Sequence, residues 1–179
     1  MILTDREILV ALQTHQIEID PPPLPDSYSS TAVDLTLSDV GFEWKSVTGL
    51  LIRPGTQGYN YHDLKKHYHQ KIEITGYTLK SKTFLLAYTK ETIDLPIRSR
   101  LAARVEGKSS IARLGVGIHI TAPTIHAGFR GTIQLEMFNF GPNDIILDAG
   151  LKICQLIFEQ TSGTPERGYS GIFQDQTIR

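Results

Sequence analysis

The stretch Val33-Asp34-Leu35-Thr36-Leu37-Ser38 decides the fold class of this 179-residue chain. Its apolar residues alternate with polar ones, which is the period-two pattern of a strand with one buried face. Similar short segments follow, with Gly, Pro and Asn turn signals about every ten residues, a spacing typical of all-β domains. The repetition predicts an antiparallel sandwich or barrel rather than a parallel α/β sheet. The predicted strands are Phe42 to Lys45, Ile72 to Ile74, Thr83 to Thr89, Leu101 to Glu106, Val116 to Thr121, Thr132 to Asn139, Ile145 to Leu147 and Ile153 to Glu159.

The segment before Val33 has a different pattern. Thr4-Asp5-Arg6-Glu7 matches a capping box, and Ile8, Leu9 and Leu12 follow at helical spacing, so we expect a short helix that ends near Gln13. The run from Pro21 to Pro25 forces an extended segment, because proline lacks the amide donor. The length suits one domain over residues 1–179, with residues 163–179 as a C-terminal tail.

Composition and charge exclude several classes of protein. The net charge of −1 and pI near 6.6 give no global basic field, so we expect no nucleic-acid partner. The single cysteine, Cys154, excludes an intrachain disulfide, and its apolar surroundings predict a buried, inert thiol. The polar N-terminus lacks a signal peptide's apolar core, and no apolar run approaches the ~20 residues of a membrane span. We therefore expect a cytoplasmic protein.

The segment Gly107 to Gly115 contains two serines beside Lys108 and follows a predicted strand. Ser109 is predicted to cap a helical turn that Gly115 closes. Free amide groups, hydroxyls and Lys108 would then converge on a spot that suits a phosphate. The alternative is a capped turn whose basic side chains, Lys108 and Arg113, are only solvated.

The strand from Thr132 to Asn139 determines which way Glu136 points. Ile133, Leu135 and Met137 share one face, whereas Gln134, Glu136 and Phe138 share the other. Glu136 therefore lies away from the aliphatic core, where a carboxylate is usually a simple surface residue. The Gly-rich link from His119 to Gly131 leads into this strand and could bring a backbone carbonyl close to Glu136.

The remaining histidines have simpler interpretations. His62, His67 and His69 lie in the polar stretch 61–69, which also contains two lysines. We interpret this stretch as a solvated loop or lid rather than a metal site. His119 is interpreted as a packed strand residue.

Several blocks of the chain, taken in order, resemble the dCTP deaminases, a family that shares its fold with trimeric dUTPases. The resemblance covers nearly the whole chain. It implies a mainly β, dUTPase-like distorted antiparallel β-barrel or jelly roll with a short N-terminal helix and few other short helices. The matching blocks are Asp5 to Ile8, Ala32 to Leu37, Gly107 to Gly115, His119 to Glu136, Gly150 to Leu156 and Gly168 to Gln176.

The resemblance also assigns roles. Glu136 would be the general base and acid that converts dCTP to dUTP and ammonia, a step of pyrimidine deoxynucleotide biosynthesis. Ser109 and the Ala122 carbonyl would hold the attacking water, Arg113 would shape the electrostatics, and the tail 163–179 would close over the nucleotide. The nucleotide-binding positions implied are Lys108, Ser109, Ser110, Ile111, Ala112, Arg113, His126, Gln134, Leu135, Glu136, Gln155, Tyr169 and Gln176.

The implied cofactors and partners follow from the same resemblance. Zinc deaminases use a His/Cys/Cys or Cys₃ site that one cysteine cannot supply, so no protein-bound metal and no zinc is expected. Mg²⁺ would arrive with the triphosphate. The partners expected are dCTP and dUTP, with dTTP as a candidate inhibitor, and a homotrimer whose active sites lie between subunits.

Two positions depart from the family pattern. His126 stands where many members have an aspartate that serves the sugar and, in dUTPases, the hydrolytic water. Ile172 stands where several relatives have a phosphate-contacting lysine. Two alternatives therefore stay open: a bifunctional dCTP deaminase and dUTPase that releases pyrophosphate and dUMP, and a catalytically silent nucleotide-binding regulator.

Overall fold

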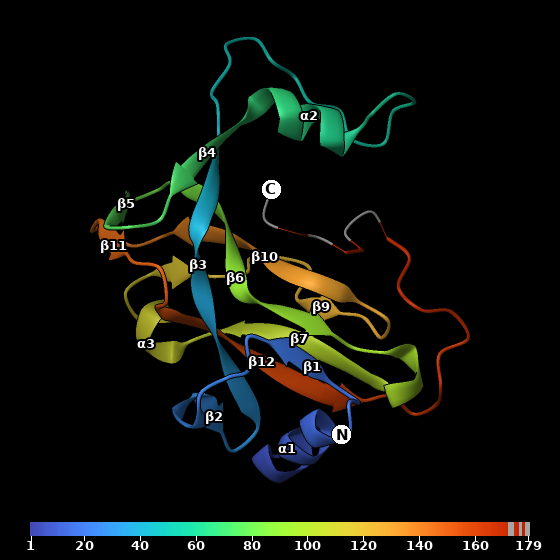
Figure 1. Cartoon of the computed structure of the whole chain (residues 1–179). Helices are drawn as coiled ribbons and strands as arrows, with labels where there is room; N and C mark the ends of the chain where they lie inside the picture. The colour runs from blue at the N-terminus through green and yellow to red at the C-terminus, as the bar shows by residue number, and fades with distance from the viewer. Residues whose placement is uncertain (172–173, 176, 178–179) are drawn as a thin grey trace.

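The N-terminal helix begins and ends where the sequence predicts. The computed structural model describes residues 1–171, 174, 175 and 177. Helix α1 spans Asp5–Gln13, and the Thr4 amide donates a hydrogen bond to the Glu7 carboxylate (3.0 Å), as expected for a capping box. Ile8 and Ala11 are buried, so this face of α1 anchors the helix to the sheet (Figure 1).

The main element is an antiparallel sheet, which confirms the predicted mainly β fold. Among the described residues, ten strands form one sheet whose central path runs β8-β10-β6-β3-β12-β7-β9, while β5 and β11 pair separately. The strands are β1 Glu18–Asp20, β2 Tyr28–Ser29, β3 Ala32–Trp44, β4 His69–Glu73, β5 Tyr77–Leu79, β6 Phe84–Asp94, β7 Leu101–Gly107, β8 Val116–Gly117, β9 Thr124–Ile125, β10 Arg130–Asn139, β11 Ile145–Leu147 and β12 Lys152–Gln160. The remaining elements are α2 Tyr61–Tyr68, α3 Ser109–Ala112 and the 3₁₀ turns Pro25–Ser27 and Ile97–Ser99.

Strand β3 makes the sheet curl, because it pairs with different neighbours along its length. Its first part pairs with β12, and its second part pairs with β4 and β6. The register with β6 shifts between Leu37 and Gly41, at the polar pair Ser38 and Asp39. The predicted strand at Phe42 is therefore the end of this long strand, since the irregularity interrupts the period-two pattern.

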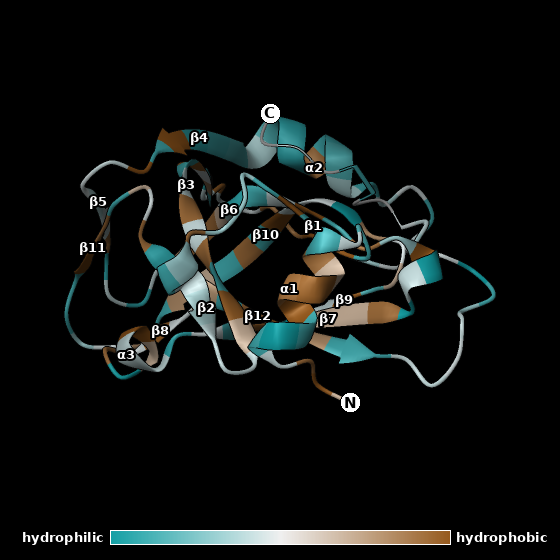
Figure 2. Ribbon diagram, turned by 60° about the horizontal axis from the view of Figure 1, so that its bottom comes forward, coloured by the Kyte–Doolittle hydropathy of each residue, from teal (hydrophilic) through white to brown (hydrophobic). Residues whose placement is uncertain are grey.

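The core lies inside the curled sheet. Ile133, Leu135 and Met137 of β10 are buried in it, whereas Gln134 and Glu136 point to the other face. Figure 2 shows the corresponding alternation of hydrophobic and hydrophilic bands along β10. Cys154 is fully buried in the same core, as predicted, and burial raises the pKa of its thiol. The face of Glu136 was therefore predicted correctly from periodicity.

The prediction of a loop at residues 61–69 was wrong. Residues Tyr61–Tyr68 form α2, and the Asn60 side chain caps it by accepting a hydrogen bond from the His62 amide (2.9 Å). His69 begins β4 and is buried against Trp44. The polar helix folds here because it packs on aromatic residues of the sheet, and this tertiary contact is not visible in the local pattern.

The described residues contain no group of three or more His, Cys, Asp or Glu side chains that could hold a metal ion. None of their helices is long and apolar enough to cross a membrane.

Candidate active site

Glu136 lines a cavity of about 210 Å³ on the outer face of β10. The cavity is formed by the link that leads into β10, by β10 itself and by one residue of the C-terminal tail. The lining includes the polar side chains of His119, His126, Gln134, Glu136 and Tyr169, together with Ala122. The structure thus brings together five predicted site residues and adds His119.

His119 lies directly against Glu136. Its Nδ1 lies 2.6 Å from Oε2 of Glu136, and its Nε2 lies 2.9 Å from the carbonyl oxygen of Ala122. Both neighbours are acceptors, so both ring nitrogens are placed to carry a proton, as in an imidazolium. Ala122 has φ +56°, an uncommon conformation for a residue other than glycine, and this aims its carbonyl at the imidazole.

The charge state of His119 follows from its surroundings. Its side chain is 6% exposed, and burial alone would lower the pKa of the imidazole. The contact with the Glu136 carboxylate and the bond to the Ala122 carbonyl act in the opposite direction, so the net pKa of His119 is raised above 6.5. The contacts with Glu136 and Ala122 therefore favour the protonated form of the His119 ring.

This pair predicts a pH-dependent stability. The raised pKa of His119 means that its stabilising contribution is fully present below pH 6.5 and is lost as the pH rises through the folded-state value. We expect His119→Asn to lower the free energy of unfolding by on the order of 1 kcal/mol at low pH, and by less at high pH. Urea unfolding from about pH 5.5 to about pH 9 measures this difference. His15→Asn, at an exposed histidine, is the matched control. A difference between wild type and His119→Asn that does not vary with pH would contradict the prediction.

The C-terminal tail lies against the turn that precedes β10. The rings of Tyr169 and His126 stack with centroids 5.7 Å apart and an interplanar angle of 12°. The Tyr169 amide donates to the Ala127 carbonyl (3.0 Å), and the Asp175 amide donates to the Arg130 carbonyl (2.8 Å). The ring of His126 is thus already in contact with a residue of the tail. Gln176 and Ile172, two further tail positions singled out in the sequence, lie outside the described residues.

Gly128 allows this close approach and gives a second prediction. Its φ is +88°, and a Cβ there would lie 2.9 Å from the Tyr169 nitrogen. Gly128→Ala therefore carries a backbone cost of about 1–2 kcal/mol and should displace the tail. We expect faster trypsin cleavage after Arg167, which precedes the docked segment. Gly163→Ala, where a Cβ meets no atom within 4 Å, is the control, and equal cleavage rates for both variants would contradict the prediction.

The base-binding candidates lie on β10. The Gln134 side chain donates to the Tyr88 hydroxyl (2.7 Å), so its amide is already oriented. Leu135 has a fully buried side chain, and only its backbone can reach a nucleotide. Strand β8 pairs only with Phe138 and Asn139, so no described strand pairs with the outer edge of β10 beside Glu136. This edge can offer main-chain donors and acceptors to a ligand.

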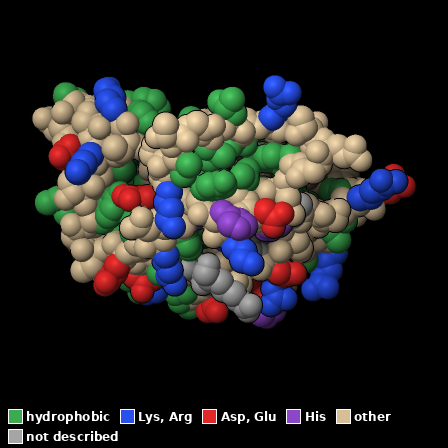
Figure 3. Space-filling view, turned by 90° about the horizontal axis from the view of Figure 1, so that it is seen from above, with side chains coloured by type: hydrophobic (Ala, Val, Ile, Leu, Met, Phe, Trp, Pro, Cys, Tyr) green, Lys and Arg blue, Asp and Glu red, His purple; other side chains and the backbone are tan. Residues whose placement is uncertain are grey.

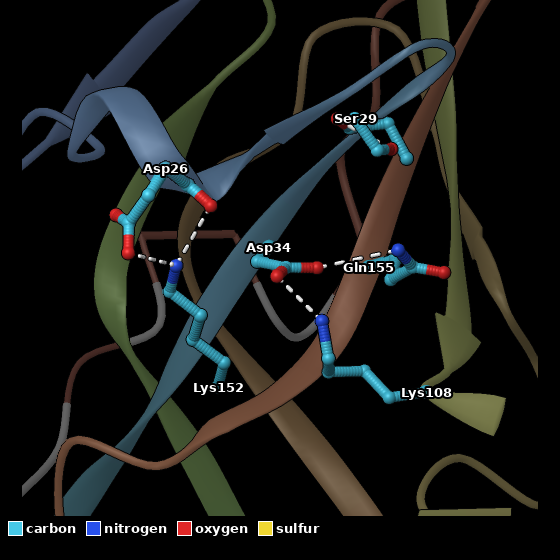
Figure 4. A network of polar contacts seen from close by, with 7 residues as sticks. Asp26, Ser29, Asp34, Lys108, Lys152 and Gln155 are labelled. Carbon is cyan, nitrogen blue, oxygen red and sulfur yellow. Dashed lines mark hydrogen bonds and ion pairs between the residues drawn. The ribbon is translucent and has the colours of Figure 1, made fainter. Parts of the chain in front are cut away.

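The second group of predicted residues surrounds Asp34 (Figure 4). Lys108 Nζ lies 2.5 Å from Asp34 Oδ2, and the Gln155 amide donates to Asp34 Oδ1 (3.2 Å). The predicted N-cap was wrong by one residue: Lys108 is still extended, so it is the N-cap, and Ser109 is the first residue of α3. Gly115 closes this turn with φ +93°, as predicted.

The structure does not bring these two groups together within one chain. No residue from Lys108 to Arg113 lines the Glu136 cavity. Ser109, Ser110, Ala112 and Arg113 are exposed, while Ile111 is partly buried against the core. In Figure 1, α3 lies at the left edge of the molecule, whereas β9 lies to the right of its centre. Each chain therefore presents two separate parts of the predicted site.

Comparison with known proteins identifies the family of this chain. The sequence profile described as dCTP deaminase-like matches residues 2–161. The chain belongs to the dCTP deaminase-like family. This dCTP deaminase-like chain is 34% identical over 176 residues to the dUMP-forming dCTP deaminase of Aquifex aeolicus, covering 98% of this chain and 91% of the relative. It is 33% identical to the dCTP deaminase of Rhodospirillum rubrum, covering 95% and 88% of the two chains.

Solved structures support the fold of this dCTP deaminase-like chain. The 2'-deoxycytidine 5'-triphosphate deaminase of Agrobacterium tumefaciens superposes with a TM-score of 0.69 at 20% identity, covering 89% of this chain and 48% of that one. A dUTPase of Staphylococcus bacteriophage 80alpha superposes with a TM-score of 0.53 at 8% identity, covering 87% and 97%. The dUTPase-like fold is thus confirmed.

His119 is a residue of the candidate site that the sequence pattern did not predict. The predicted strand Val116 to Thr121 ends at Gly117, so His119 belongs to a loop that turns back through Ala122. The loop places a nearly buried imidazole on Glu136, and the interpretation of His119 as a strand residue was wrong. The one available signal was Pro123, which follows Ala122 and cannot continue a strand's hydrogen bonding.

Proposed function

We propose that this chain hydrolytically deaminates the cytosine ring of dCTP, with Glu136 as the general base and acid. The observation that carries the proposal is the position of Glu136, which is the one carboxylate among the described residues that line the cavity. Its side chain is 29% exposed, so it can meet both a ligand and a water molecule. The relatives from Aquifex aeolicus and Rhodospirillum rubrum, both named dCTP deaminases, support the same activity.

The proposed reaction uses Glu136 twice. The carboxylate takes a proton from water as the oxygen attacks C4 of cytosine, and it delivers that proton to N3. It then moves the remaining hydroxyl proton to the amino group, the C4–N bond breaks, and ammonia leaves as the C4 carbonyl forms. The atoms balance as dCTP plus water giving dUTP plus ammonia, and Glu136 ends as the carboxylate.

Ala122 and His119 would prepare the water for this step. The Ala122 carbonyl has a second lone pair beside the one that accepts from His119, and it can orient a water at Glu136. The His119 ring, whose Nδ1 lies 2.6 Å from Oε2, would hold the carboxylate of Glu136 in place beside this water. Gln134 and the unpaired edge of β10 would hold the base through amide and main-chain groups.

Each complete site would join two copies of the chain. Lys108, Ser109, Ser110 and Arg113 would serve the triphosphate and the water, but they lie away from the cavity of their own chain. A homotrimer, implied by the resemblance to trimeric dUTPases, would place this turn of one copy over the Glu136 cavity of the next. Asp34 holds Lys108 in the unliganded chain, and phosphate oxygens would compete for the same ammonium group.

Mg²⁺ would belong to the substrate rather than to the protein. A triphosphate brings Mg²⁺ with several of its waters, and the ion needs only one or two further carboxylate ligands. Asp34, which pairs with Lys108, would be the carboxylate that meets this hydration shell if the triphosphate binds at Lys108. The ion would neutralise phosphate charge during binding, and the protons of the deamination would still move through Glu136.

One experiment tests the proposal. Purified protein is incubated with dCTP and, separately, with dUTP and Mg²⁺, and ammonia, pyrophosphate and nucleotide products are measured. Ammonia release with dUTP as the only nucleotide product supports simple deamination. The absence of ammonia, together with measurable nucleotide binding, would contradict the proposal and support a silent regulator.

A second function, a dUMP-forming deaminase, is favoured by a specific observation. The Aquifex aeolicus relative and those of Methanosphaera stadtmanae and Methanobrevibacter smithii are named dCTP deaminase, dUMP-forming. In the family pattern, however, an aspartate takes the place of His126, which here stacks on Tyr169. Pyrophosphate released from dCTP and dUTP in the same assay would establish this function.

A further inference from the structure

A contact between two glycines joins the α3 turn, residues 109–115, to the segment that follows β10. Gly141 is buried, and a Cβ there would lie 2.5 Å from the carbonyl oxygen of Leu114. From the other side, a Cβ on Gly115 would lie 2.6 Å from the backbone of Gly141. The two segments therefore touch backbone to backbone, and this approach requires residues without a side chain.

The segment that carries Gly141 is itself held by several hydrogen bonds. The Asn139 side chain is fully buried; its Oδ1 accepts from the Gly141 amide (3.0 Å), and its Nδ2 donates to the Asn143 carbonyl (2.8 Å). The Ser81 hydroxyl donates to the Gly141 carbonyl (2.6 Å). Because a buried, fully bonded polar network rigidifies its surroundings, residues 139–143 form a firm support for the α3 turn.

Arg113 lies immediately before this contact. The Phe140 amide donates to the Gly115 carbonyl (2.8 Å). Together with the approach of Gly141 to Leu114, this hydrogen bond fixes the backbone directly after Arg113. Arg113 itself is exposed, so the place of its guanidinium depends on that backbone rather than on packing around the side chain.

We propose that Gly141 is a positioning residue, which sets the place of Arg113 by supporting the α3 turn from the end of β10. The inference rests on the proposed function, in which Arg113 serves a nucleotide bound in the Glu136 cavity of the next copy. Strand β10 and the segment after it would then act on two sites. Glu136 would serve the cavity of its own chain, and Gly141 would place Arg113 for the site of a neighbour.

The exact place of this cation matters because the chain has no excess of positive charge to substitute for it. The net charge is −1, and on the face seen from above in Figure 3 the Lys and Arg side chains are interspersed with Asp and Glu. A charged group stabilises a transition state only from the correct position, and a displacement of about 1 Å can lower the rate by roughly 10²-fold.

The test adds one methyl group at the contact. In Gly141→Ala the new Cβ would meet the Leu114 carbonyl, so we expect the α3 turn to shift and kcat for dCTP to fall roughly 10- to 100-fold. Ser81→Ala is a milder variant that removes a hydrogen bond to the Gly141 carbonyl, and kcat should fall roughly two- to fivefold. Gly117→Ala is the matched control and should retain the wild-type kcat, because its Cβ would press on the half-exposed Phe140 ring, which can turn away.

Mixing of variants separates a positioning role from a general loss of structure. Gly141→Ala should damage the α3 turn of its own chain and leave the Glu136 cavity intact. Co-refolding it with Glu136→Gln should therefore recover about a quarter of wild-type activity, since one of four random neighbour pairings joins an intact cavity to an intact turn. Co-refolding it with Arg113→Ala should recover none, because both chains then carry a damaged turn. A variant whose whole fold is damaged would recover activity with neither.

The outcomes separate this inference from the proposed function. Wild-type kcat in Gly141→Ala overturns the inference, and so does a failure to complement Glu136→Gln where Arg113→Ala complements it. If neither variant complements, the inference fails with the proposed assembly. If Gly141→Ala does not fold, the kcat of Ser81→Ala decides. If wild type releases no ammonia, the proposed function fails, and calorimetric titration with dCTP decides: weaker binding by Gly141→Ala than by Gly117→Ala supports the inference, and equal or absent binding overturns it.

Discussion

Replacing Glu136 with Gln should lower the rate of ammonia release from dCTP by at least ~10²-fold, the usual loss when a general acid–base is removed. Glutamine keeps the shape of the side chain on β10 but cannot take a proton from water. Nucleotide binding should persist, because the groups proposed to hold the phosphates and the base lie elsewhere. Steady-state kinetics and equilibrium binding of dCTP measure the two effects separately.

Glu159→Gln is the matched control for this prediction. Glu159 also lies on a strand, is 39% exposed and pairs with Arg104, but it does not line the cavity. We expect turnover close to wild type in this variant. Turnover close to wild type in Glu136→Gln would exclude the proposed mechanism, whereas loss of nucleotide binding together with turnover would indicate a binding role for the carboxylate.

Two inactive variants should restore activity when they are mixed. Arg113→Ala removes a charge of the α3 turn, and we expect at least ~10²-fold loss, as for other groups that stabilise charge in a transition state. Glu136→Gln damages the cavity instead. If one site joins the cavity of one copy to the turn of the next, one of four random neighbour pairings is intact. Equal co-refolding should therefore recover about a quarter of wild-type activity.

The control for mixing is a chain that carries both changes. Co-refolding the double variant with Glu136→Gln leaves every cavity without its carboxylate, so no recovery is expected. Recovery with the two single variants and none with the control supports sites between copies. If the single variants recover nothing although size-exclusion chromatography shows mixed oligomers, the two half-sites belong to one chain and the proposed assembly is wrong.

Local patterns were sufficient where a short stretch controls its own geometry. Period-two alternation predicted that Glu136 points away from Leu135 because successive side chains of a strand alternate in direction. The capping box predicted the start of α1 because Thr4 and Glu7 form hydrogen bonds with each other within one turn. Strands β1, β2, β5 and β9, which have two or three residues each, escaped prediction.

The same reasoning failed where distant segments meet. Residues 61–69 were interpreted as a solvated loop or lid because their side chains are polar, but α2 is stabilised by the contacts of Lys65 with Phe42 and of Tyr61 with His69. The contact of His119 with Glu136 joins positions of a loop and a strand, and it depends on the positive φ of Ala122. Pro123, which follows Ala122, signals only that the strand pattern ends there.

The sequence by itself determined the fold class, the family resemblance and the face of Glu136, because strand periodicity, helix caps and ordered motifs act over a few neighbouring residues. The tertiary structure decided which groups meet. It placed His119 and Tyr169 in the Glu136 cavity, and it kept Arg113 and Lys108 out of that cavity. Chain reversals and the curl of β3 set these distances, and they arise from packing across the whole sheet rather than from local preferences.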